Sequence, residues 1–107
     1  MSQEATDQNF ADKVIAVSKT KPVLVDFWAA WCGPCRAMGP VIDEVAAAVG
    51  DSAGVCKVNV DENPEMSAKY AIQSIPSLKI FRDGEVVAEF VGGQSRETLV
   101  AALNEHK

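Results

Sequence analysis

VLVDFWAAWCGPC, residues 23–35, joins a short run of β-forming residues to two cysteines separated by a glycine and a proline. The run from Val23 to Trp28 is almost continuously apolar, which is typical of a strand buried on both faces of a sheet. Downstream of the cysteines, apolar residues recur on one helical face, at Met38, Val41, Ile42, Val45 and Val49. The stretch therefore predicts a buried strand, a turn that carries the cysteines, and a helix that Gly50 ends.

Six further elements are predicted outside this stretch. They are a helix around residues 10–17 after the cap residues Thr6, Asp7 and Asn9, a buried strand over 54–60, a short helix over 64–70, two strands over 77–81 and 85–91 that Asp83-Gly84 joins as a hairpin, and a final helix capped by Ser95. A strand–helix–strand order implies a parallel crossover, whereas a hairpin is antiparallel. We therefore expect one α/β domain over residues 1–107, with a central mixed sheet of four to five strands and helices on both faces.

The composition and net charge limit the classes of partner and the location that can be expected. The chain has 107 residues, 48% of them hydrophobic, and a net charge of −5. This charge argues against nucleic acid and anionic membranes, which select for basic patches, and no stretch has the length of a membrane span. The first ten residues, MSQEATDQNF, lack the basic and apolar regions of a secretory signal. Three cysteines are no disulfide framework, so a reducing, cytoplasmic location is expected.

Metal binding and structural cross-linking are two alternatives to redox chemistry for the cysteine pair. A structural zinc site usually has four ligands, and outside Cys32 and Cys35 the chain offers only Cys56 and His106. Cys56 stands in an apolar stretch, where a small buried hydrophobe is expected. A disulfide that closes so short a loop removes little entropy from the unfolded chain. We therefore expect neither a metal nor a purely structural role.

The junction between strand and helix favours thiol–disulfide exchange. Cys32 is expected at the helix start, where free backbone N–H groups and the helix dipole stabilise a thiolate, the nucleophilic form. Cys35 follows one turn later and deeper, placed to attack a mixed disulfide formed at Cys32. Pro34 fits the first helical turn and stiffens the loop. The sequence thus predicts that Cys32 is an exposed, reactive thiol and that Cys35 is shielded.

FWAAWCGPC, residues 27–35, resembles the active-site segment of the thioredoxin family. The similarity extends over essentially the whole chain, through Asp26, Pro40, Lys57, Ile75-Pro76, Asp83-Gly84 and Val91-Gly92. Arg36 stands where a lysine is more familiar but keeps the positive charge, and Cys56 is an additional thiol. The resemblance implies the thioredoxin fold and a dithiol–disulfide oxidoreductase that reduces disulfides in other proteins.

Two charged residues interrupt the predicted buried strands. Burial raises the pKa of a carboxyl such as Asp26, and perturbed carboxyls cluster at active sites, which favours a functional over a structural role. Asp26 stands six residues before Cys32, and the resemblance implies that it moves protons to or from Cys35. Lys57 is interpreted either as a solvated strand-end lysine or as a partner that makes the burial of Asp26 less costly, and both interpretations stay open.

The substrate site is expected around Ile75-Pro76. An X-Pro bond is usually trans, so the sequence alone predicts trans. The resemblance implies instead a cis bond beside the disulfide, which turns the backbone of Ile75 toward an extended substrate peptide. The expected apolar lip consists of Trp31, Gly33, Pro34, Ile75, Pro76 and Gly92. Gly92 is read as a site of close backbone approach, with a hairpin-end glycine as the alternative.

The expected partners follow from the chemistry. The chain carries no dinucleotide fingerprint, so electrons must come from a separate protein. The resemblance implies a thioredoxin reductase and disulfide-containing client proteins, with no cofactor and no metal, and we expect a monomer. Two alternatives remain: a binding subunit of the same fold without turnover, and an oxidant or isomerase. Gly33-Pro34 between the cysteines and the lack of a signal weigh against the second alternative.

Overall fold

The computed structural model describes residues 2–107, which form a five-stranded sheet of order β1-β3-β2-β4-β5. The strands are β1 (Gln3–Glu4), β2 (Val23–Trp28), β3 (Gly54–Asn59), β4 (Ser77–Arg82) and β5 (Glu85–Val91). The pairs β1·β3 and β2·β3 are parallel, and β2·β4 and β4·β5 are antiparallel. The predicted mixed sheet is thus confirmed, with the two-residue β1 as a strand that the sequence did not indicate.

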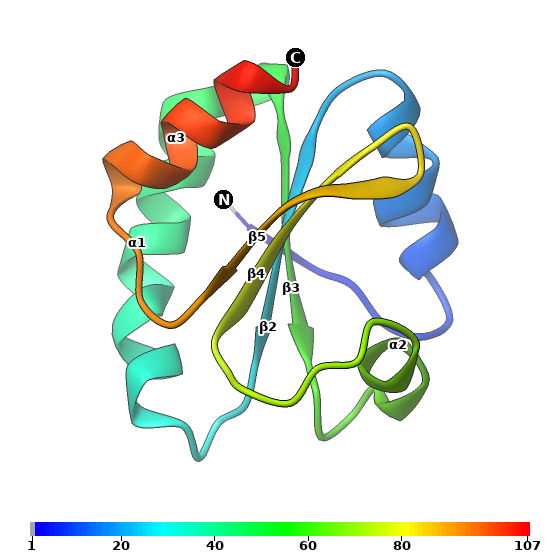
Figure 1. The fold of residues 1–107 in the computed structure, drawn as a ribbon, viewed down its shortest axis with the longest axis vertical. Coiled ribbons are helices and arrows are strands. Elements are labelled where there is room, and N and C mark those ends of the chain that lie inside the picture. The colour runs from blue at the N-terminus through cyan, green and yellow to red at the C-terminus, as the bar shows by residue number, and fades with distance from the viewer. Residues whose placement is uncertain (1) are drawn as a thin grey trace.

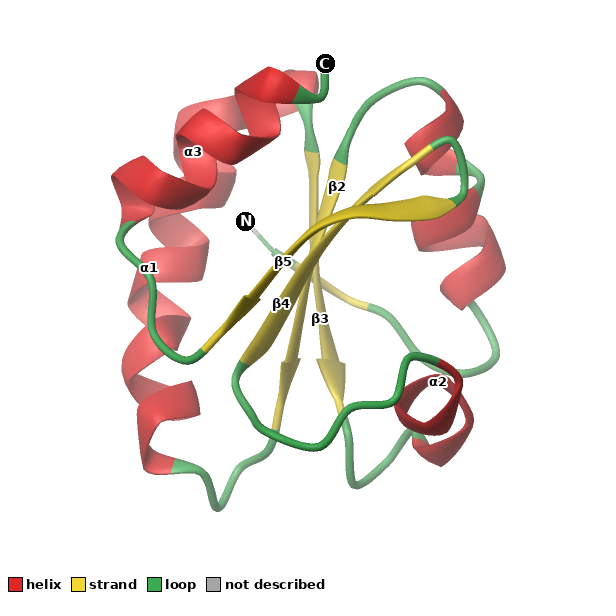
Figure 2. Ribbon diagram, in the orientation of Figure 1, coloured by secondary structure: helices red, strands yellow, loops and turns green. Residues whose placement is uncertain are grey.

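Helices cover both faces of the sheet, as predicted. On one face lie α1 (Gly33–Val49) and α3 (Arg96–Glu105), and on the other lie η1 (Ala11–Ile15) and α2 (Pro64–Lys69) (Figures 1 and 2). Short 3₁₀ segments, η2 (Val17–Lys19) and η3 (Gly50–Ser52), end the first and second helical regions. Within residues 2–107, no helix is both long and apolar enough to span a bilayer.

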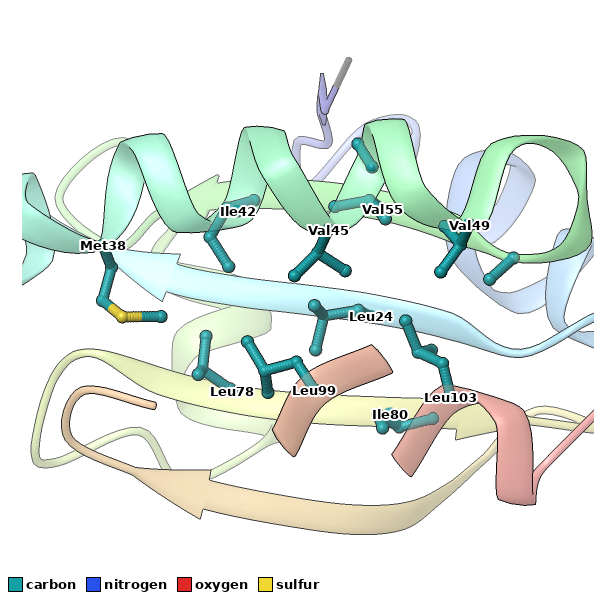
Figure 3. Packing of buried hydrophobic residues seen from close by; sticks show 12 residues of the cluster. Leu24, Met38, Ile42, Val45, Val49, Val55, Leu78, Ile80, Leu99 and Leu103 are labelled. Atoms are coloured by element: carbon teal, nitrogen blue, oxygen red, sulfur yellow. The ribbon is translucent and has the colours of Figure 1, made fainter. Parts of the chain in front are cut away.

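β2 is the centre of the core, because its side chains alternate between two apolar clusters. Leu24 packs in the cluster under α1 and α3 (Figure 3), and Val25 and Phe27 pack in the cluster under η1 and α2. All three side chains are fully buried, and burial of one such side chain contributes about 1.5–3 kcal/mol. The continuous apolar run of β2 is therefore explained by helices on both sides.

The N-terminal helix differs from the prediction in its winding and its capping. η1 is wound as a π-helix rather than an α-helix. Thr6 and Asn9 exchange hydrogen bonds: the Thr6 N–H donates to Asn9 Oδ1 (2.7 Å), and the Asn9 N–H donates to Thr6 Oγ1 (3.3 Å). Asp7 instead accepts the N–H groups of Glu65 (3.1 Å) and Met66 (2.9 Å), in the first turn of α2. One of the three predicted cap residues therefore stabilises a helix almost sixty residues away.

The topology collects four segments at one edge of the sheet. β2 and β3 end at this edge, β4 begins there, and β5 ends there, as their pairing registers require. The segments that follow or precede these strand ends are Ala29–Cys35, Val60–Asn63, Ile75-Pro76 and Gly92-Gly93. The cysteine pair and the predicted lip are thus brought to one end of the molecule.

Candidate active site

Cys32 and Cys35 form a disulfide at the start of α1, with their Cα atoms 5.2 Å apart. Cys32 is the N-cap residue, and its Sγ accepts the backbone N–H of Cys35 at 3.2 Å. This contact directs a backbone donor and the positive end of the helix dipole at the Cys32 sulfur, which favours negative charge there. In this oxidised form Cys32 is only 5% exposed and Cys35 2%, so the prediction of an openly exposed Cys32 is wrong. Both cysteines form a small buried cluster with Ala29, against which Trp28, Val60 and Ile75 pack.

The Ile75-Pro76 bond is cis, as the resemblance implied and contrary to the expectation from base frequencies. The carbonyl oxygen of Ile75 lies 3.9 Å from Cys32 Sγ. The Gly92 N–H donates to the carbonyl oxygen of Pro76 at 2.8 Å, which joins the two sides of the lip. Gly92 has φ +90°, and no atom lies within 4 Å of where its Cβ would stand. Backbone conformation, rather than a close approach within the chain, therefore accounts for this glycine.

The remaining lip residues lie at the same edge. Trp31 is 67% exposed, and Gly33 and Pro34 are exposed beside it, whereas Pro76 is buried. Trp31 Nε1 donates to Asp61 Oδ2 at 2.8 Å. Sequence reasoning missed Asp61, because no pattern in the sequence pairs it with a tryptophan thirty positions away.

Asp26 is fully buried on the α1 face of β2, between Lys57 of β3 and Leu78 of β4. Neither of its carboxylate oxygens has a hydrogen-bond partner among residues 2–107. Burial raises the pKa of Asp26 to about 6, and the positive charge of Lys57 opposes this rise. The structure thus gives Asp26 the perturbed pKa that the sequence predicted, without a structural hydrogen bond to explain its presence.

Lys57 fits the second interpretation in part, because its charge opposes the rise in the pKa of Asp26 and so makes the burial of the carboxylate less costly. It stands directly opposite Asp26 in the sheet, but no ion pair joins the two side chains in the described part of the chain. Its Nζ lies 4.5 Å from the centre of the Trp28 ring, a cation–π contact. Lys57 therefore acts on Asp26 through its electrostatic field and not as a bound partner.

In the described part of the chain, the other candidate metal ligands do not cluster with Cys32 and Cys35. Within residues 2–107, no group of three or more His, Cys, Asp or Glu side chains is arranged to hold a metal ion. Cys56 is a buried free thiol in β3, and burial raises its pKa. The site is therefore built around the two cysteines, a buried carboxyl and the backbone of a cis-proline turn.

A vicinal cysteine pair that caps a helix can cycle between dithiol and disulfide, and this places the chain among the thiol–disulfide oxidoreductases. Comparison with known sequences gives the family. The thioredoxin family model matches residues 1–105. The thioredoxin of Alicyclobacillus acidocaldarius is 52% identical over 98 residues, which cover 92% of this chain and 90% of that protein.

Two further relatives agree with this match. Thioredoxin 1 of Synechococcus elongatus is 50% identical over 101 residues (94% of this chain, 92% of that protein). The thioredoxin of Staphylococcus epidermidis is 45% identical over 103 residues (96% and 95%). The chain belongs to the thioredoxin family, and Cys32 and Cys35 are its redox-active pair.

Proposed function

We propose that this protein reduces disulfide bonds in client proteins, with Cys32 as the attacking thiol and Cys35 as the resolving thiol. The observation that carries the assignment is the position of Cys32 at the N-cap of α1, where its sulfur accepts a backbone N–H and borders the Ile75 carbonyl. The same N–H stabilises a thiolate at Cys32 once the disulfide is reduced. Cys35 has no such position, since it lies inside the first turn.

The reaction has two exchange steps. The Cys32 thiolate attacks one sulfur of the client disulfide, forms an intermolecular disulfide and releases the other client sulfur as a thiolate. Cys35 then loses its proton and attacks Cys32, which re-forms the internal disulfide and releases the second client thiolate. Two electrons have passed from the chain to the client, and a reductase must return them.

Asp26 is proposed as the group that takes the proton from Cys35. A pKa of about 6 leaves the carboxyl mostly ionised at neutral pH, yet it binds a proton far better than an ordinary aspartate. The unpaired carboxylate oxygens support this role, because no hydrogen bond within residues 2–107 has to break before a proton is accepted. Lys57 is proposed to tune this pKa by its charge.

The client is proposed to bind as an extended segment across the lip of Trp31, Gly33, Pro34, Ile75, Pro76 and Gly92. Within residues 2–107, neither the N–H nor the C=O of Ile75 has a backbone hydrogen-bond partner. Such unpaired groups support main-chain pairing with an added strand. Trp31 supplies exposed apolar surface beside it.

The partners and setting are proposals of the same kind. We propose a thioredoxin reductase as the electron donor, disulfide-containing proteins as clients, a cytoplasmic location and a monomeric state, with residues 1–107 forming one domain. The net charge of −5 supports a partner other than nucleic acid or an anionic membrane.

An insulin reduction assay tests the function. The chain should accelerate dithiothreitol-dependent precipitation of insulin, and a variant with Cys32→Ser and Cys35→Ser should match dithiothreitol alone. Acceleration by the double-serine variant would mean that the chain acts on clients without redox turnover. Equilibration with glutathione buffers separates a reductase from an oxidant, because a reductase should give up its electrons to oxidised glutathione almost completely.

A further inference from the structure

The loop from Gly92 to Ser95 carries one side of the lip and is anchored at both ends. The Gly92 N–H donates to the Pro76 carbonyl, and Ser95 caps α3 by accepting the N–H of Thr98 at 3.1 Å. Between these anchors, the Gln94 N–H donates to the sulfur of Met38 at 3.4 Å. The middle of the loop is therefore attached to α1, the helix that begins with the cysteine pair.

Met38 lies three residues after Cys35 on the inward face of α1 and is only 4% exposed. Its side chain points toward the sheet, at the end of the apolar cluster where β2 terminates (Figure 3). A Cβ built on Gly93 would lie 3.9 Å from the Met38 sulfur, so the loop passes within van der Waals reach of it. Packing and a hydrogen bond thus meet at the same sulfur atom.

We propose that Met38 is a positioning residue that holds the Gly92 side of the lip in register with the Cys32–Cys35 pair. The path runs from Cys35 through one helical turn to the Met38 sulfur, across to the Gln94 N–H, and along the loop to Gly92 and Pro76. This inference rests on the proposed function, since it assigns Met38 to the binding of protein clients at that lip.

The sulfur atom, and not only the volume of the side chain, is required by this proposal. Leucine has a similar volume and fills the cluster, but it offers no acceptor, so the Gln94 N–H loses its partner within the protein. A loop that is less well fixed must be ordered when a client binds, which weakens binding. A small disulfide that reaches only the sulfurs does not pay this cost.

The test compares Met38→Leu with Met66→Leu as a matched control, because Met66 is a half-buried methionine of α2 that packs in the opposite cluster. Second-order rate constants of the reduced proteins are measured with insulin and with 5,5′-dithiobis(2-nitrobenzoic acid). We expect the ratio of insulin rate to small-disulfide rate to fall roughly twofold to tenfold in Met38→Leu, the range that one lost hydrogen bond gives, and to stay unchanged in the control. Amide hydrogen exchange at Gln94 should become faster in Met38→Leu only.

Each outcome decides the matter. An unchanged ratio in Met38→Leu overturns the proposal, even if exchange at Gln94 becomes faster. Equal slowing with both disulfides also overturns it, since Met38 would then support the fold or the cysteines rather than the lip. Failure of the parent protein to reduce insulin while it still reduces the small disulfide would count against the proposed function itself.

Discussion

Asp26 offers the sharpest test of how burial and function are related in this protein. Its carboxyl is fully buried without a hydrogen-bond partner in the described residues, and its pKa rises from 3.8 to about 6 on folding. Because the folded state holds the proton more tightly than the unfolded chain, the contribution of Asp26 to stability is complete below pH 4. It declines as the pH rises from about 4 to about 6, and above that range the ionised carboxylate is a constant penalty.

The size of the penalty follows from the two pKa values. One pKa unit corresponds to about 1.4 kcal/mol, so the carboxylate destabilises the folded state by about 3 kcal/mol at pH 8 relative to strongly acidic conditions. Asp26→Asn keeps the shape but removes the ionisation. The free energy of unfolding of this variant, relative to the parent, should therefore increase by about 2 kcal/mol between pH 4 and pH 8.

Urea denaturation of both proteins at pH 4, 6 and 8 measures this change. Packing differences between Asp and Asn cancel, because only the pH dependence of the difference is used. The rate at which the variant reduces insulin at pH 7 should also be at least about tenfold lower, since Cys35 loses its proton acceptor. A stability difference that does not vary with pH would contradict the raised pKa of Asp26. A difference that shifts in favour of the parent as the pH rises would indicate a stabilising ion pair with Lys57.

Three other residues give further expectations. Cys56→Ala should leave insulin reduction unchanged and lower the free energy of unfolding by about 1 kcal/mol. In the folded parent protein, Cys56 should be alkylated slowly, because it is buried and its pKa is raised. Rapid alkylation in a mass-spectrometric time course would contradict this expectation. Lys57→Gln removes the charge that opposes the effect of burial, so an NMR titration should find the pKa of Asp26 above 6, and an unchanged value would exclude the electrostatic role of Lys57. Asp7→Ala removes the acceptor for two N–H groups of α2 and should lower the free energy of unfolding by about 1–2 kcal/mol, with the small-disulfide rate unaffected; a fall in that rate would show that α2 supports the cysteines.

The central elements of the fold were predictable because each has a strong local signal. The apolar run of β2 requires cover on both faces, and the helical periodicity after Cys35 defines α1. Asp83-Gly84 adopts φ values of +55° and +81°, the left-handed pair that a tight hairpin needs. These features depend on neighbouring residues, so they can be read without knowing the tertiary structure.

The features that were missed depend on long-range contacts. β1 has two residues and is defined only by its pairing with Cys56 and Lys57. It is too short for an alternating apolar pattern to indicate a strand. Asp7 was expected to cap the helix that follows it, yet its partners lie in α2. A local pattern cannot distinguish between two helices that both have free N–H groups.

The functional site shows the same contrast between features with a local sequence signal and features that depend on long-range contacts. Cys32 and Cys35 could be assigned from their position between strand and helix. The cis bond before Pro76 could be predicted only from the family resemblance, because X-Pro bonds in general favour trans. Whether Lys57 pairs with Asp26 or contacts Trp28 depends on side-chain direction within the sheet, which the strand pattern leaves undecided.

The most direct test of the account is to trap the intermediate of the exchange reaction. In a Cys56→Ala background, Cys35→Ser and Cys32→Ser each leave one thiol, and each variant is mixed with insulin and analysed by mass spectrometry without reductant. Cys35→Ser should accumulate an insulin adduct through Cys32, because attack proceeds and resolution fails, whereas Cys32→Ser should form almost none. Equal adduct formation by the two variants would contradict the assignment of Cys32 as the attacking thiol.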